Sequence, residues 1–245
     1  MDFDVVDRLS DSSYVESIMH GYTLRDGTSI RPGESHWHMV LRKIQGKVDI
    51  LVVGPLTKSG VVSYDKDAEL LWIKFKLGTF MPHLPVRDCL NMETILPGAA
   101  RKAFWLKGSA WQFPDFENTE AFVERLVREE VLVSDPVINT VLQDYPHDLS
   151  SRTVRHRFLR ATGLTQGQIR QMDRARQAAT LLEQGHSILD VTYQLGYFDQ
   201  PHLTRSLRQW VGHTPAQIMR MGQPACDMSE VQVLLPEFEE SVLSL

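Results

Sequence analysis

The sequence predicts an α+β protein in which an N-terminal β-rich domain precedes an all-α domain. Within residues 36–77 hydrophobic residues alternate with polar ones, whereas from Thr119 onward they recur at helical spacing. Asp135 and Pro136 form a helix start, with Asp as the N-cap and Pro at the first helical position. A chain of 245 residues is long enough for two domains. We therefore expect domains at residues 1–133 and 134–220, followed by an acidic tail at 221–245.

Strand patterns are clearest in two places within the β-rich part. From residue 70 to 77, Leu71, Ile73 and Phe75 alternate with Trp72 and lysines, as in a half-buried strand. Residues 37–44 and 47–53 flank Gln45-Gly46, which predicts a tight hairpin. Residues 80–118 are rich in Pro, Gly and aromatic residues, so we expect irregular structure with one short helix. A helix beginning at Thr119 then ends the domain.

Composition excludes several classes of protein. The chain is 42% hydrophobic and 23% charged, as in an ordinary soluble protein, and it lacks an apolar run long enough for a membrane span. The acidic N-terminus has no signal-peptide core, which argues against secretion. Cys89 and Cys226 are too few for a disulfide framework or a cysteine metal site. These features predict a cytoplasmic protein.

The net charge of −5 conceals a strong asymmetry along the chain. Residues 148–220 contain ten arginines, no lysine and five acidic residues, a net charge of +5, whereas residues 221–245 contain five acidic residues and no base. Arginine presents a planar fork of donors that suits phosphates and guanine edges. A basic segment within an acidic protein indicates a surface for nucleic acid.

Two segments of the C-terminal domain repeat one design, a capped helix with a polar outer face. In the first, Ser150 is the N-cap, and Leu149 and Val154 have the spacing of a hydrophobic staple. Because Val154 and Phe158 should face inward, the helix turns other side chains outward and ends at Gly163. The outward residues are Ser151, Arg152, Arg155 and His156.

The second segment also has a leading helix, which begins at Ser187 and ends before Gly196. Asp199 then caps the following helix, with Phe198 and Leu203 as its expected staple. Helix, sharp turn and helix in this order form a helix-turn-helix unit. The residues that should face outward are Gln200, His202, Arg205 and Gln209.

A long helix should connect the two units. Thr165 and Gln168 have the spacing of a capping box that opens it, and its buried stripe runs to Leu182. Helices of this kind fit the major groove, where their first turns meet base edges. Two recognition helices held at a fixed separation could therefore enter successive major grooves of double-stranded DNA.

Residues 181–218 resemble the signature of the AraC/XylS family of transcription regulators. The matching residues are Leu181-Leu182, Gly185, Ile188, Asp190-Val191, Leu195-Gly196-Tyr197, Asp199-Gln200, His202-Leu203, Arg205 and Gly212-x-Thr214-Pro215. Residues 152–171 look like the family's first recognition helix and the start of its connecting helix. The resemblance implies a bundle with two helix-turn-helix units, in which the base-facing positions correspond to Arg152, Arg155 and His156 in the first unit and to His202 and Arg205 in the second. In one departure, the helix expected before the first recognition helix is short, and Tyr145-Pro146-His147-Asp148 interrupts it.

For the N-terminal domain, the resemblance implies a cupin-like or small-barrel domain that senses a small-molecule effector or mediates dimerisation. Trp37, His38 and Trp72 are candidates to line an effector pocket. His36-x-His38 could suggest a metal site, but no third ligand stands at a fixed spacing, and we predict neither a metal nor another cofactor.

The sequence thus predicts a sequence-specific DNA-binding regulator without enzymatic activity. Expected partners are double-stranded DNA, a small-molecule effector, a second copy of the chain and RNA polymerase, but no membrane. One alternative is a cupin-type metal-dependent enzyme with an appended DNA-binding module, although the sequence contains no catalytic motif for it. The other is a protein-interaction adaptor that has lost DNA binding, which the acidic tail and the incomplete first unit would suit.

Overall fold

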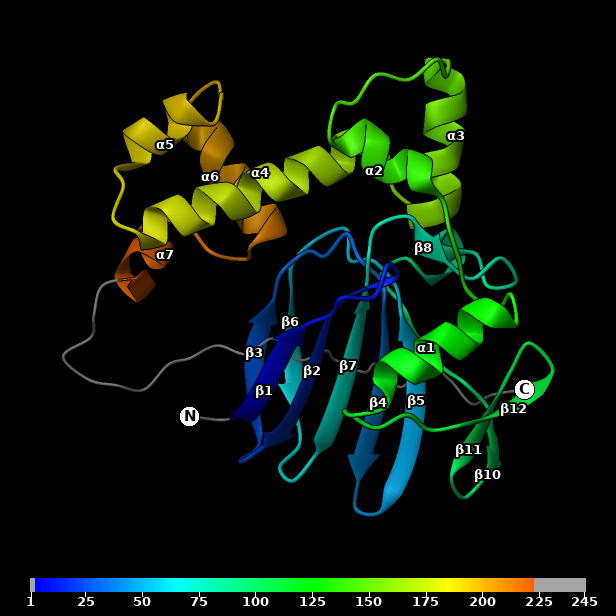
Figure 1. Cartoon of the computed structure of the whole chain (residues 1–245). Coiled ribbons are helices and arrows are strands. Elements are labelled where there is room, and N and C mark those ends of the chain that lie inside the picture. Colours follow the sequence, from blue (N-terminus) through cyan, green and yellow to red (C-terminus); the bar gives the residue numbers. More distant parts are fainter. Residues whose placement is uncertain (1–2, 223–245) are drawn as a thin grey trace, which may run out of the picture.

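The structure, a computed structural model, describes residues 3–222 and places a β-rich domain before a helical one (Figure 1). This is the predicted order. Cys226 and all but the first two residues of the predicted acidic tail lie outside the described residues. The strands are β1 (Phe3–Leu9), β2 (Val15–Thr23), β3 (Gly27–Arg31), β4 (His38–Ile44), β5 (Lys47–Val53), β6 (Gly60–Tyr64), β7 (Glu69–Phe75), β8 (Thr79–Phe80), β9 (Glu93–Ile95), β10 (Gly98–Ala100), β11 (Ala103–Leu106), β12 (Ser109–Gln112) and β13 (Val133–Ser134). The helices are η1 (Val86–Cys89), α1 (Thr119–Arg128), α2 (Pro136–Leu142), α3 (Ser151–Thr162), α4 (Gln166–Glu183), α5 (Ile188–Gln194), α6 (Gln200–Trp210) and α7 (Pro215–Gly222).

An antiparallel sheet of six strands, in the order β1-β2-β7-β4-β5-β9, forms the centre of the N-terminal domain. The predicted hairpin at Gln45-Gly46 is confirmed, since both residues have positive φ and Ile44 pairs with Lys47 across the turn. A ribbon of β3 and β6 and a small sheet of β10, β11 and β12 complete the domain.

Both faces of this sheet are covered. Leu71, Ile73 and Phe75 of β7 pack in one core, together with Val123 and Leu126 of α1. Trp72 points to the other face, where it packs with Tyr64 of β6 in a second core. The prediction that β7 is half-buried is therefore wrong for Trp72, which is 5% exposed, because the β3–β6 ribbon covers that face.

Two further expectations for this domain need correction. Residues 3–31, for which no strand was predicted, contain β1, β2 and β3. Residues 80–118 contain four short strands, β9 to β12, besides the expected short helix η1, so this segment is irregular only in part.

The larger core continues from the sheet into the helical region. Its members include Phe158 of α3 and Ile169 and Met172 of α4, all of them fully buried. α3 lies against η1 and β8, and the side chain of Arg160 covers the ring of Phe80. The predicted boundary between residues 133 and 134 falls within β13, which pairs with β8 of the sheet domain. The two regions therefore share buried hydrophobic surface.

Candidate nucleic-acid interface

Helices α5 and α6 form a helix-turn-helix unit at one end of α4 (Figure 1). The Ser187 hydroxyl accepts a hydrogen bond from the amide of Asp190 and caps α5, and the Asp199 carboxylate accepts one from the amide of His202 at 2.7 Å and caps α6. Gly196 has a φ of +67°, a conformation that costs glycine little and other residues more. The predicted caps and turn are thus present.

The staple predicted for α6 is wrong. Phe198 is 88% exposed, and Tyr197, only 3% exposed, fills the core beside Leu203 and Leu207. Since neighbouring residues in this turn point to opposite sides, one inward aromatic ring forces the other outward.

The outer face of α6 carries the candidate residues. Leu203, Leu207 and Trp210 are buried, whereas Gln200, Arg205 and Gln209 are exposed. His202 is half-buried, because its ring lies edge-on to Tyr197 with the ring centroids 5.2 Å apart. Three of the four predicted side chains therefore face outward, and His202 is partly held by the turn.

Helix α3 presents its candidate residues in the same way. Ser150 caps it by accepting from the amide of Thr153 at 3.2 Å, and Gly163 ends it in the left-handed conformation. Val154 and Phe158 are buried. The candidates Ser151, Arg152, Arg155 and His156 are all exposed.

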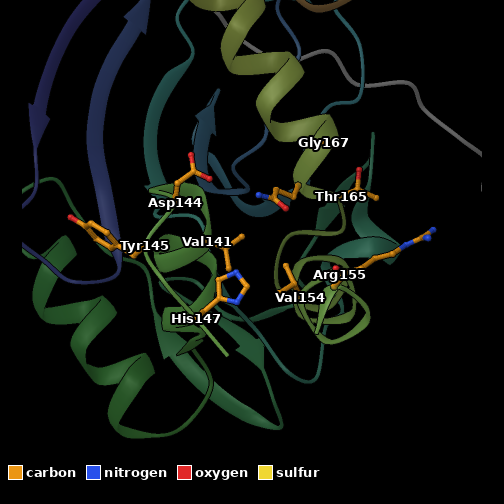
Figure 2. Close-up of a pocket in the computed structure, with 10 residues that line it drawn as sticks. Val141, Asp144, Tyr145, His147, Val154, Arg155, Thr165 and Gly167 are labelled. Carbon is orange, nitrogen blue, oxygen red and sulfur yellow. The ribbon is translucent and has the colours of Figure 1, made fainter. Parts of the chain in front are cut away.

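The first unit departs from a regular helix-turn-helix, as the sequence indicates. α2 ends at Leu142, and the residues that follow, up to Ser150, are not helical, whereas only a short turn separates α5 from α6. Between this long connection and the N-termini of α3 and α4 lies a pocket of about 340 Å³ (Figure 2). In Figure 2 His147 lies toward the pocket, while Arg155 extends away from it. An ion pair between Asp144 and Arg170 of α4 fixes one side of the connection.

Helix α4 joins the two units. The predicted capping box is present, with Thr165 and Gln168 each accepting from the other's backbone amide. Ile169, Met172 and Leu182 are fully buried along one face. Eighteen helical residues span roughly 27 Å at 1.5 Å per residue. The buried stripe and this length keep α3 and α6 at a fixed separation.

The arginines of this region divide into two groups. Three of them form ion pairs within the protein: Arg157 with Asp135, Arg170 with Asp144, and Arg176 with Glu34. Other arginines are exposed and make no ion pair with a carboxylate among residues 3–222. This second group includes Arg152, Arg155, Arg205 and Arg208, besides Arg160 and Arg220. Arg152 and Arg155 belong to the predicted face of α3 and Arg205 to that of α6, and Arg208 lies beside them on α6.

The β domain binds the last turn of α6. The amide of Gly33 donates to the carbonyl of Trp210, and the amide of Ser59 donates to that of Gln209, each at 2.7 Å. The Ser59 hydroxyl donates to the carbonyl of Arg208 at 2.9 Å. A Cβ atom on Gly212 would lie 2.4 Å from the side chain of Ile30, so the contact is close. Sequence reasoning missed these contacts, since no local pattern marks them.

A half-buried ionic network joins the β domain to α4 beside these contacts. His36 lies 2.8 Å from both Glu16 and Glu34, and Lys74 pairs with Glu16 at 3.1 Å. Arg176 of α4 donates to Glu34 and to the carbonyl of Gly33, both at 2.9 Å, instead of only bordering the hydrophobic stripe. Burial alone would lower the pKa of His36, but its hydrogen bonds to Glu16 and Glu34 outweigh burial and raise it.

A cavity of about 330 Å³ opens between the six-stranded sheet and β3. Its lining includes Met19, Arg31, Glu34, His38, Trp72 and Lys74. Nε2 of His38 is shielded from solvent and has no hydrogen-bond partner among the described residues, and burial lowers the pKa of this imidazole to about 3. Two of the three predicted pocket residues, His38 and Trp72, thus line the same cavity.

Trp37 lies elsewhere. Its indole N–H donates to the carbonyl of Thr79 at 2.6 Å, and its ring stacks on Phe75 with the centroids 4.0 Å apart. Trp37 lines a void of about 10 Å³ beside Val52 and Met81. That is no more than a water needs, so Trp37 is a core residue in this structure.

The described part of the chain provides no evidence for a metal centre or a membrane span. Among residues 3–222, no three His, Cys, Asp or Glu side chains are grouped as metal ligands. Within the same residues, no helix combines the length and the apolar composition needed to cross a bilayer.

Two capped helices with outward arginines, joined by one long helix, define a tandem helix-turn-helix domain, a class that binds DNA. Residues 148–221 match the family model of a helix-turn-helix domain. The HTH-type transcriptional regulator RipA of Corynebacterium glutamicum is 35% identical over 89 residues, which are 36% of this chain and 27% of RipA. The chain thus matches about a quarter of that relative's length. Residues 148–221 therefore form a helix-turn-helix domain, and this segment includes the residues that resemble the AraC/XylS signature.

Comparison of the whole chain with solved structures gives similarity to ToxT from Vibrio cholerae O395. One ToxT structure has a TM-score of 0.39 at 10% identity and covers 91% of this chain and 99% of ToxT. Another, bound to (E)-4-(8-methylnaphthalen-1-yl)but-3-enoic acid, has a TM-score of 0.34 at 12% identity and covers 91% and 100%.

Proposed function

We propose that this protein is a sequence-specific DNA-binding transcription regulator that acts in the cytoplasm and has no catalytic activity. The observation that carries the proposal is the placement of Arg155 and Arg205. Each stands exposed, without a carboxylate partner among the described residues, on the outer face of a capped helix. α3 and α6 each share a buried hydrophobic cluster with α4, which supports a fixed arrangement of the two helices.

The proposed reading of DNA follows from groove geometry. α6 and α3 each enter the major groove, where an arginine can donate two hydrogen bonds to O6 and N7 of a guanine. α4 is roughly 27 Å long, and the helices at its two ends add their own width to the separation of α3 and α6. That separation is comparable to the ~34 Å between successive major grooves on one side of a duplex. Arg152 and Arg208 flank the reading residues and would bind phosphates, which fixes the register of the protein on DNA.

We further propose that the β domain senses a small-molecule effector in the cavity lined by His38 and Trp72. A volume of about 330 Å³ is in the range of ligand pockets. Arg31 and Glu34 line this cavity, and the intervening Gly33 binds the end of α6, so a ligand there would contact the segment that holds the recognition helix. Homodimer formation and contact with RNA polymerase remain proposals that the resemblance suggests.

Selection from a random duplex library by the full-length protein tests the DNA-binding proposal. We expect enrichment of one motif, and expect the Arg155→Ala, Arg205→Ala double variant to lose that enrichment while it keeps the wild-type melting temperature. Recovery of unenriched sequences by the wild-type protein would contradict sequence-specific binding and favour the adaptor alternative. Metal analysis of the purified protein tests the enzyme alternative, which requires a stoichiometric metal.

A further inference from the structure

The last turn of α6 is bound by two loops of the β domain. The carbonyls of Arg208, Gln209 and Trp210 are groups that a helix leaves without a partner at its C-terminus. Ser59 and Gly33 of the β domain bind all three, at distances of 2.7 to 2.9 Å. Wherever α6 docks, the loop between β5 and β6 that contains Ser59 must accompany it.

The length of α6 determines what this loop would meet on DNA. The helix has eleven residues, which span roughly 16 Å at 1.5 Å per residue. The major groove is only about 12 Å wide. A recognition helix that enters the groove with its first turns therefore brings its last turn, and the loop bound to it, close to the phosphates at the groove's edge.

Lys58 is the residue of this loop that is suited to meet a phosphate. Both of its neighbours are anchored: Thr57 donates from its amide and its hydroxyl to the side chain of Asn91, at 2.7 and 2.9 Å, and Ser59 binds α6. Lys58 itself is exposed and makes no ion pair with a carboxylate among residues 3–222. Its backbone is thus fixed beside the helix while its ammonium group faces solvent.

We propose that the β domain contributes directly to the DNA-binding surface, through a phosphate contact made by Lys58 beside the C-terminal end of α6. This inference rests on the proposed function, because it requires α6 to lie in the groove. It extends the interface beyond residues 148–221 and makes the docking of the β domain on α6 a determinant of affinity. A phosphate contact adds affinity without reading sequence, so Lys58 strengthens binding at every site.

A different role for Lys58 would be to stabilise α6 within the protein, since a cation near the C-terminus of a helix interacts favourably with the helix dipole. The two roles differ in measurable ways. A stabilising role would lower the melting temperature of a Lys58 variant and leave the salt dependence of DNA binding unchanged. A phosphate contact would leave the melting temperature unchanged and reduce the salt dependence.

The test compares Lys58→Ala, Lys58→Arg and Lys66→Ala with the wild-type full-length protein. Lys66 is a matched control, because it is also exposed and lies just beyond the opposite end of β6. Binding to a duplex selected by the wild-type protein is followed by fluorescence anisotropy from 50 to 200 mM KCl. Each phosphate contact contributes about 0.9 to the slope of log K against log salt and about fivefold in affinity at 0.15 M salt.

We expect Lys58→Ala to bind about fivefold more weakly at 0.15 M salt, with a slope smaller by about 0.9. Lys58→Arg and Lys66→Ala should match the wild type. A Lys58→Ala protein with the wild-type slope and affinity would overturn the inference while the proposed function stands. If the wild-type protein itself bound no duplex, the proposed function would fail, and this inference with it.

Discussion

Replacing Gly196 by valine tests whether the turn of the second unit is held by backbone conformation. The φ of this residue is +67°, and no atom lies within 4 Å of the position where a Cβ would be added. The substitution therefore introduces no clash, and its whole effect comes from forcing an L-residue into the left-handed region. That costs about 1–2 kcal/mol, and a β-branched residue lies at the upper end of the range. For a protein of this size the loss should lower the melting temperature by roughly 2–8 °C.

The assay is thermal unfolding followed by circular dichroism, combined with DNA binding to a selected duplex. Gly167→Val is the matched control: this glycine also has open space around it, but it lies within α4 with an ordinary helical φ. Valine is a better helix former than glycine, so the control should melt at or slightly above the wild-type temperature. Equal melting temperatures for the two variants would refute the strained-turn explanation.

Three further predictions concern single side chains. Arg205→Ala should weaken binding to a selected site by about 1–3 kcal/mol and relax the base preference at one base pair. The control Arg128→Ala, at an exposed position on α1, should bind like the wild type. Equal affinities of Arg205→Ala and the wild-type protein for the selected duplex would show that Arg205 is not in the interface. Arg176→Ala should destabilise the fold by about 1–3 kcal/mol, because the half-buried carboxylate of Glu34 loses one of its charged donors. A double-mutant cycle with Glu34→Gln should give a coupling energy above about 0.5 kcal/mol, whereas additive effects of the two substitutions would show that the pair is unimportant. In the folded protein the pKa of His38 is about 3, below its unfolded value, so the free energy of unfolding should fall as the pH drops from 6.5 toward 3. At pH 5, His38→Gln should recover about 2 kcal/mol of that loss. A variant whose stability depends on pH as in the wild type would contradict the assignment.

Features that depend on neighbours in the sequence could be predicted well. Ser150, Asp199 and Ser187 were each expected as caps, and each accepts the hydrogen bond that this role requires. The turn at Gly196 and the hairpin at Gln45-Gly46 are likewise local, because each needs one backbone conformation that glycine readily adopts. The helical domain therefore follows largely from its sequence.

Features that depend on distant contacts could not be predicted. β1 is an edge strand in which hydrophobic and polar residues do not alternate regularly, and it pairs with β2, a contact that the local pattern does not reveal. The contacts of Gly33 and Ser59 with α6 join residues about 150 or more positions apart. The grouping of Trp37 with Trp72 in one pocket failed for a simpler reason. Trp37 precedes His38 by one residue and so points to the opposite face, a consequence of the strand period of two.

The central claim is that α3 and α6, held apart by α4, meet one duplex together. Hydroxyl-radical footprinting of the full-length protein on a selected duplex tests it most directly. We predict two protected segments on the same side of the duplex, with centres about one helical turn (roughly 10 base pairs) apart. A single protected segment, or two segments on opposite sides, would contradict the claim.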